Sequence, residues 1–194
     1  MEKGNEFINK YPKASTEEIN NFIRKEMVKK YLSEPNQSTT GEVTTQGGVV
    51  YGVTLNDQEM ALYNSNPWSG LISLYSGSVA LDESEARYQS AVLTDGNGDA
   101  FRHAFWNSLM TMNIGADWAK AWSDAHEYGT PNNPPLPQEM DLFNNSVGIY
   151  QAQTRFNQYN SSTWGDMIEE RVDVGGMKRI VDNLLVDTDS SGKI

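Results

Sequence analysis

The chain has 194 residues, with 15 basic and 26 acidic side chains and a formal net charge of −11. One domain is expected at this length, and a hydrophobic fraction of 38% is sufficient for a buried core. The lack of cysteine excludes disulfide scaffolds, thiol nucleophiles and cysteine-containing zinc sites. With only 2 histidines, a three-histidine metal site is excluded as well. A pI of about 4.6 argues against sequence-independent nucleic-acid binding, which needs a basic surface.

The first predicted element is an amphipathic helix in the N-terminal segment 1–35. Ser15 and Glu18 form a capping-box sequence at its start, and apolar residues recur behind them at helical spacing. The following segment, 36–54, is polar and rich in threonine and glutamine. We expect it to be a linker or a short extended segment.

Residues 55–186 are predicted to form a helical core domain. Helical segments are expected to begin near Asn56 and at Pro67, and to span 99–113, 116–128, 137–156 and 163–186. Residues 187–194 are expected to be an acidic tail. The sequence is therefore predicted to form an all-α, single compact multi-helix domain with an N-terminal amphipathic helical extension.

No membrane-spanning segment is expected, because the longest apolar stretch, 70–81, is short and interrupted by serines. The first residues are polar and lack the apolar core of a signal peptide. The protein is therefore expected to be soluble, and either cytoplasmic or exported with its signal absent from this chain.

Polar side chains occur among core residues in three consecutive predicted helices. The helix 99–113 is apolar nearly all round, which is typical of a buried helix, yet it contains Arg102 and His103. Such groups need partners, because an unpaired buried polar group costs about 1–3 kcal/mol. Asp99, His103 and Asn107 are four residues apart and share one stripe.

The candidate catalytic residues are drawn from all three helices: Arg102, His103, His126, Glu127, Asp141, Asn144 and Asn145. Each has a structural explanation when taken alone, such as a core histidine, a first-turn carboxylate or a histidine near a helix C-terminus. Their concentration within a short part of the chain favours a common site, which we predict to lie between the three helices.

Two kinds of chemistry are open to this cluster. His103, His126, Glu127 and Asp141 are suitable ligands for zinc or another divalent ion, and Arg102 would then hold an anionic group. Without a metal, His103 or His126 would be a general base oriented by Asp141 or Glu127. In that case Arg102 and the asparagine amides would stabilise developing charge.

The three segments resemble an uncharacterised bacterial domain family. Its motifs are Arg-His-x-x-Trp-Asn, Ala-His-Glu and Met-Asp-x-x-Asn-Asn-x-x-Gly, which begin here at Arg102, Ala125 and Met140. The resemblance covers about residues 56–156, and family members occur in bacterial surface, phage-related and toxin-like proteins. It implies a helical domain with these residues at its centre, but it supplies no reaction. The site is also loosely similar to helical zinc phospholipases and nucleases, which use more histidines.

A separate calcium signal lies at the C-terminal end. Asp187, Asp189 and Ser191 match the first, third and fifth positions of an EF-hand or dockerin-type loop. We treat calcium binding here as a weaker prediction than a metal in the polar cluster.

The functional expectation is a bacterial hydrolase, an effector or an envelope-acting enzyme, that acts on an anionic or polar substrate. Phosphodiesters, lipids and cell-envelope components belong to this class. One alternative is a non-catalytic binding or interaction domain whose buried polar network only fixes the helix packing. A further alternative is a small-molecule or peptide binder with Trp106, Trp118 and Trp122 as pocket walls.

Overall fold

The computed structural model describes residues 47–50, 52–155 and 161–194. The predicted N-terminal helix and most of the predicted linker lie outside these residues. The described part contains six helices and two short antiparallel strand pairs, so the prediction of a mostly α-helical domain is confirmed. Within the described ranges, no helix combines the length and the apolar composition needed to cross a bilayer.

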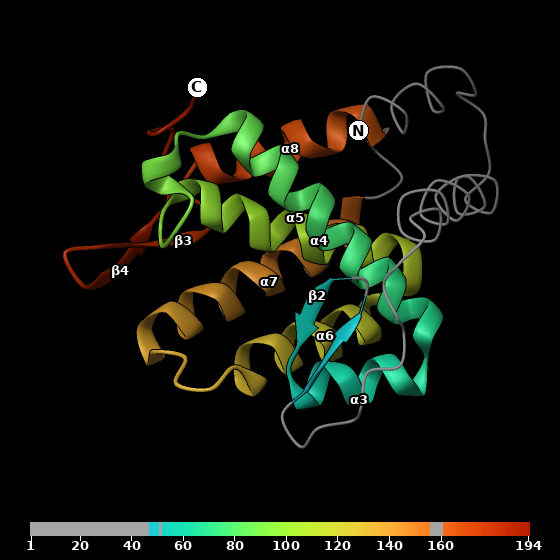
Figure 1. The fold of residues 1–194 in the computed structure, drawn as a ribbon. Coiled ribbons are helices and arrows are strands. Elements are labelled where there is room, and N and C mark those ends of the chain that lie inside the picture. The colour runs from blue at the N-terminus through green and yellow to red at the C-terminus, as the bar shows by residue number, and fades with distance from the viewer. Residues whose placement is uncertain (1–46, 51, 156–160) are drawn as a thin grey trace.

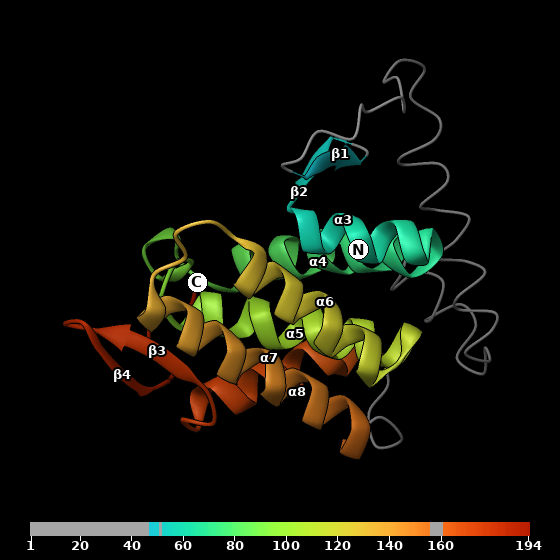
Figure 2. The same cartoon turned by 90° about the horizontal axis from the view of Figure 1, so that it is seen from below.

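The elements are, in chain order, β1 (Gly48–Val50), β2 (Val53–Leu55), α3 (Asp57–Ser65), α4 (Pro67–Arg87), the 3₁₀ turn η1 (Ser90–Val92), α5 (Asn97–Ile114), α6 (Ala116–Gly129), α7 (Pro135–Arg155), α8 (Ser161–Asp173), β3 (Lys178–Val181) and β4 (Leu184–Asp187). The hairpin β1–β2 lies beside α3, whereas β3–β4 lies at the opposite end of the helical bundle (Figures 1 and 2).

Helix α5 is the centre of the fold. It contacts α4, α6, α7 and α8, which surround it in both views (Figures 1 and 2). Twelve of its eighteen residues are buried, and the buried set includes polar as well as apolar side chains. The polar stripe predicted on this helix is therefore enclosed by neighbouring helices and must find its partners there.

The first two helices of the described part of the chain begin where the capping residues predict. Asn56 caps α3 in a capping box with Glu59, whose Oε2 accepts a hydrogen bond from the Asn56 backbone N–H at 2.9 Å. Pro67 occupies the start of α4, where its missing N–H costs nothing. Between α5 and α6, Gly115 has φ of 95°, a conformation that favours glycine and ends α5 sharply.

A close approach of α5 and α7 brings their polar residues together. Gly148 of α7 faces the backbone of α5, and a Cβ at this position would collide with the carbonyl oxygen of Ala104. The glycine of the Met-Asp-x-x-Asn-Asn-x-x-Gly motif is therefore required by backbone packing. The stripe on α5 can then contact side chains that project from α7.

The prediction of a helix from 163 to 186 is wrong beyond Asp173. Helix α8 ends there, and β3 and β4 follow as an antiparallel hairpin with Val181 opposite Leu184. The two residues between the strands, Asp182 and Asn183, have φ of 52° and 60°. Positive φ at both central residues is the signature of a type I′ turn, which matches the twist of a hairpin.

The residues after β4 pack against the connection between α4 and α5. The backbone N–H of Gln89 donates to the carbonyl of Gly192 at 2.8 Å, and that of Ile194 donates to Arg87 at 3.0 Å. The last segment of the chain is thus an ordered part of the fold, where the sequence predicts only an acidic tail.

Candidate metal centre

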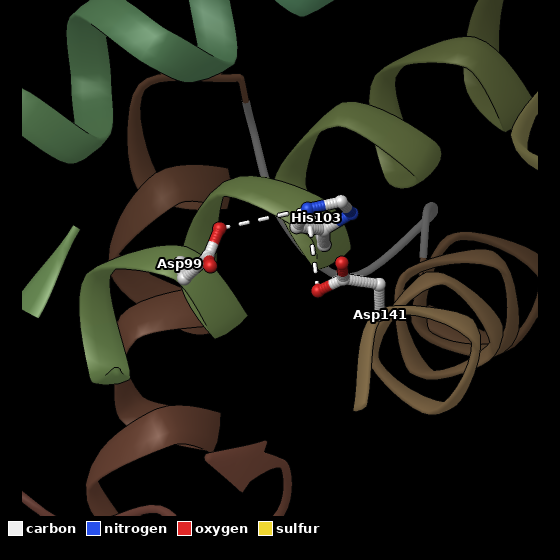
Figure 3. A group of neighbouring side chains, drawn as sticks. All are labelled: Asp99, His103 and Asp141. Atoms are coloured by element: carbon white, nitrogen blue, oxygen red, sulfur yellow. Dashed lines mark ion pairs between the residues drawn. The ribbon is translucent and has the colours of Figure 1, made fainter. Parts of the chain in front are cut away.

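Three side chains from α5 and α7 form a compact group that could hold a metal ion. They are Asp99, His103 and Asp141, and one potential ligand atom from each lies within 4.8 Å of the others. Nε2 of His103 lies 3.4 Å from Oδ1 of Asp141 and 3.5 Å from Oδ1 of Asp99. Figure 3 shows the imidazole ring between the two carboxylates, one from its own helix and one from α7.

The start of α5 positions two members of this group. Asp99 lies in the first turn, where a carboxylate is favoured by the helix dipole, and His103 follows one turn later on the same stripe. Oδ2 of Asp99 accepts a hydrogen bond from the backbone N–H of Asp95 at 2.7 Å. This contact holds the carboxylate so that Oδ1 faces His103.

Arg102 determines the protonation of the His103 ring. Its Nη2 donates to Oδ1 of Asp99 and lies 3.0 Å from Nε2 of His103. A guanidinium group can only donate, so Nε2 must be the acceptor and carries a lone pair. The ring proton is therefore on Nδ1, and Nε2 accepts from Arg102 on the edge of the ring that lies near both carboxyl groups.

A buried amide network on the other side of the ring fixes this tautomer. Nδ1 of His103 donates to Oδ1 of Asn145 at 3.1 Å, and the same oxygen accepts from Nδ2 of Asn107 at 2.6 Å. Nδ2 of Asn145 donates in turn to Oε1 of Glu127 at 3.4 Å. The three motifs thus meet in one hydrogen-bonded chain, which is how proteins orient histidine ligands of metals.

The group is buried but reaches the surface on one side. His103 is only 2% exposed, and Glu127, Asn107 and Asn145 are also buried. The side chains of Asp141 and Arg102 are 14% and 29% exposed. A small molecule or ion would therefore approach from the side of these two residues.

The electrostatics oppose full ionisation of the clustered carboxyl groups. Burial and the carboxylates of Asp99 and Glu127 raise the pKa of Asp141 to about 8. Burial also raises the pKa of Glu127 and, together with Arg102, holds the pKa of His103 well below its usual range. A neutral imidazole is the form that binds metals, and a cation would offset the clustered carboxylates.

One oxygen of Asp141 provides an independent indication. Within the part of the chain that the structure describes, Oδ1 of Asp141 is buried without a hydrogen-bond partner. The same atom faces the Nε2 lone pair of His103. A carboxyl with a pKa of about 8 holds a proton at neutral pH, and a divalent ion that replaced this proton would bond both Oδ1 and Nε2. The donor set of two carboxylates and one imidazole therefore fits a divalent ion.

The group of Asp99, His103 and Asp141, called the geometric group below, differs from the ligand set predicted from the sequence. His103 and Asp141 belong to it, and Asp99 replaces His126 and Glu127. Oε1 of Glu127 lies 3.7 Å from Nδ1 of His103, on the ring edge opposite Nε2. Glu127 therefore lies on the Nδ1 side of the imidazole ring and does not face the carboxyl groups near Nε2.

His126 lies beside the centre and has its own carboxylate partner. Its Nδ1 is 2.8 Å from Oε1 of Glu59, a buried residue of α3. Its ring stands edge-on to Trp106, with centroids 5.3 Å apart. Burial opposes protonation of His126, but the hydrogen bond and the charge of Glu59 outweigh it and raise the pKa of the imidazole.

Asn144 is not part of the polar cluster around His103. Its Nδ2 donates to the carbonyl of Lys178 and its Oδ1 accepts from the Lys178 N–H, both at 2.9 Å. This paired amide contact fastens β3 to α7. Of the two adjacent asparagines, only Asn145 contacts His103.

The residues predicted for calcium binding have protein partners in the structure. Asp187 pairs with Lys178 at 2.5 Å, and Asp189 pairs with Arg179. Oδ1 of Asp189 also accepts from Asn97 at 2.8 Å and from Ser191. The hydrogen bonds from Ser191 and Asn97, with the charge of Arg179, lower the pKa of Asp189 to about 2, and the contact with Asn97 anchors the C-terminal segment to the start of α5. Calcium binding here stays a prediction.

The tryptophans suggested as pocket walls lie mainly in the core. Trp122 is fully buried, and Trp118 stacks on it with centroids 6.2 Å apart. The indole N–H groups of Trp106 and Trp118 both donate to Ser73, at 2.9 and 3.0 Å. These contacts join α4, α5 and α6, which is a packing role.

Three residues of the centre and its surroundings were missed as site candidates. Asp99 and Asn107 share the stripe of His103, so helical spacing alone could have selected them. Glu59 lies 67 residues before its partner His126, and no local pattern connects the two.

Comparison with known proteins identifies the family. The family described as "Domain of unknown function (DUF6973)" matches residues 60–175, which is more than half of the chain. The chain belongs to this family. The DUF6973 match includes all three residues of the candidate metal centre and agrees with the expected uncharacterised domain family. Searches of the curated proteins and of the solved structures gave no match.

Proposed function

We propose that this DUF6973 protein is a metal-assisted hydrolase that acts on an anionic or polar substrate. The observation that carries the proposal is the convergence of Asp99, His103 and Asp141 within 4.8 Å beside a partly exposed arginine. Three protein ligands with room for water are typical of catalytic metal sites, whereas structural sites are closed by four.

The three side chains would bind the ion through one oxygen of Asp99, Nε2 of His103 and one oxygen of Asp141. An ion held in this way would supply Lewis-acid activation of water near neutral pH. The buried amide network would keep Nε2 unprotonated and available to the ion. Asn145 and Glu127 are thus positioning residues, because they act through His103.

Arg102 supports the choice of an anionic substrate. Its guanidinium lies next to the centre, is partly exposed, and presents several N–H donors. Guanidinium groups bind phosphate and carboxylate groups with paired hydrogen bonds. We therefore place phosphodiesters first among the possible substrates, ahead of neutral esters of lipids or of the cell envelope.

A metal-free mechanism with His103 as general base is less well supported. A general base works best when its pKa lies near the working pH, and burial lowers the pKa of His103. Its Nε2 also accepts a hydrogen bond from Arg102.

The competing function is a non-catalytic interaction domain. It is favoured by the nearly complete burial of His103 and by the hydrogen bonds that Asn145 makes in the core. In that case the network would only hold α5, α6 and α7 together. The exposure of Asp141 and Arg102 argues for a site that exchanges with solvent.

Hydrolysis of bis(p-nitrophenyl) phosphate and of p-nitrophenyl butyrate, with zinc or manganese and with chelator, tests the proposal. We expect metal-dependent cleavage of the phosphodiester that is lost in Asp141→Asn. Asp124→Asn is the control, since it removes a carboxylate of α6 that pairs with Lys120 on the surface. Metal-independent cleavage, an active Asp141→Asn variant, or no cleavage of either compound would contradict it.

A further inference from the structure

Arg102 contacts two of the three residues that form the candidate metal centre. Its Nη2 donates both to Oδ1 of Asp99 and to Nε2 of His103. These two atoms lie 3.5 Å apart, and Nε2 is also 3.4 Å from Oδ1 of Asp141. The guanidinium therefore shares its contacts with the position that a metal ion would take.

Nε2 of His103 has a single lone pair, which serves either a hydrogen bond from Arg102 or a bond to a metal ion. A guanidinium and a divalent ion that contacted the same two atoms would also repel each other, because both are positively charged. We propose that a divalent cation binds at Asp99, His103 and Asp141 by displacing the Arg102 guanidinium, which then turns toward the anionic substrate. This inference rests on the proposed function.

The surroundings of Arg102 allow this exchange. The side chain is 29% exposed, so the guanidinium can reach water without crossing the core. Its partners Asp99 and His103 are buried and stay in place, since Asp95 holds the first and Asn145 the second. Arg102 is thus the movable member of the centre.

The exchange has a thermodynamic consequence. Any free energy that holds Arg102 on Asp99 and His103 must be given up when the ion binds, so the arginine weakens the apparent metal affinity. After the exchange, the N–H donors that were directed at His103 and Asp99 are available to an anionic group beside the ion. Metal binding would then prepare substrate binding.

Calorimetric titration of zinc and manganese into wild type and Arg102→Met tests the exchange. Methionine keeps an unbranched side chain but removes the charge and all donors. We expect the variant to bind the ion at least about 10-fold more tightly than wild type. Lys120→Met is the matched control, because it removes an exposed positive charge from α6 and should leave the affinity unchanged.

A second readout follows Arg102 itself in wild-type protein. The Nε–H signal of Arg102 in a ¹⁵N correlation spectrum, assigned with Arg102→Met or Arg102→Lys, should shift when zinc is added. Equal or weaker binding by Arg102→Met, or an unmoved Arg102 signal in zinc-loaded protein, would overturn the exchange and leave the metal site standing. If neither protein binds either ion, the metal centre of the proposed function fails as well.

Discussion

Nδ1 of His103 donates a 3.1 Å hydrogen bond to Oδ1 of Asn145 across the crossing of α5 and α7. This contact joins the Arg-His-x-x-Trp-Asn and Met-Asp-x-x-Asn-Asn-x-x-Gly motifs and sets the tautomer of the buried imidazole. The fold and the candidate site therefore depend on the same residues. A substitution at one of these residues should change both the stability of the protein and the properties of the site.

Asn145→Ala should weaken both stability and metal binding. The substitution removes the acceptor for the Nδ1–H of His103, one acceptor of Asn107 and one donor to Glu127, and we expect a loss of about 2–3 kcal/mol in the free energy of unfolding. Metal affinity should fall about 10–100-fold, because the imidazole is no longer oriented. Chemical denaturation and calorimetric titration measure the two effects.

Asn144→Ala is the matched control for this prediction. It removes the paired contact with Lys178, so it should also lower the free energy of unfolding while leaving metal affinity unchanged. Equal metal affinities for the two alanine variants would show that Asn145 does not position His103.

Gly148→Ala should disrupt the crossing of α5 and α7. The added Cβ would collide with the backbone of Ala104, which cannot move without displacing α5, and we expect a loss of more than about 3 kcal/mol. Gly77→Ala is the control, because its Cβ would lie 3.4 Å from Nε1 of Trp106. That variant should stay within about 1 kcal/mol of wild type in a urea titration. Similar stabilities for both would contradict the close approach.

The pKa values of the two histidines should be shifted in opposite directions from the usual value of an imidazole. Proton NMR should show His126 with a pKa above 6.5 and His103 still neutral well below that pH. In Glu59→Gln, the pKa of His126 should fall, because the hydrogen-bonded carboxylate is gone. His126→Gln assigns the signals, and unchanged titration of His126 in Glu59→Gln would refute the pairing.

The same pair affects stability with a defined sign. The pKa of His126 is raised in the folded state, so its stabilisation is complete below the unfolded pKa of about 6.5 and is lost as the pH rises through the folded pKa. The stability difference between wild type and Glu59→Gln should therefore shrink across this range. A difference that grows with pH would contradict the assignment.

The helical spacing of apolar residues predicted much of the fold. The segments 99–113, 116–128 and 137–156 correspond closely to α5, α6 and α7, because apolar spacing and the separating glycine and prolines are local signals. The hairpin β3–β4 was not predicted, because a short apolar run such as 178–187 is compatible with a helix as well as with β-strands. The turn at 182–183, whose positive φ angles distinguish a hairpin from a helix, lies inside the segment predicted to be helical.

Part of the candidate site followed from the sequence and part could not. His103 and Asp141 were predicted ligands because polar groups in apolar helices need partners, and both belong to the geometric group. Which neighbours contact which ring nitrogen depends on the crossing of α5 and α7. That geometry separates the role of Glu127 from that of Asp99, and Asn145 from Asn144.

Metal binding by wild type, Asp141→Asn and His126→Ala tests the central claim most directly. Calorimetry with zinc and manganese, together with thermal melting with and without chelator, should show one ion per wild-type chain and a raised Tm. Asp141→Asn should lose at least about 100-fold in affinity, since even outer partners of a metal site contribute 10–100-fold. His126→Ala should bind as wild type does, because His126 lies outside the group. A wild-type protein without saturable binding, or an Asp141→Asn variant with wild-type affinity, would contradict the account.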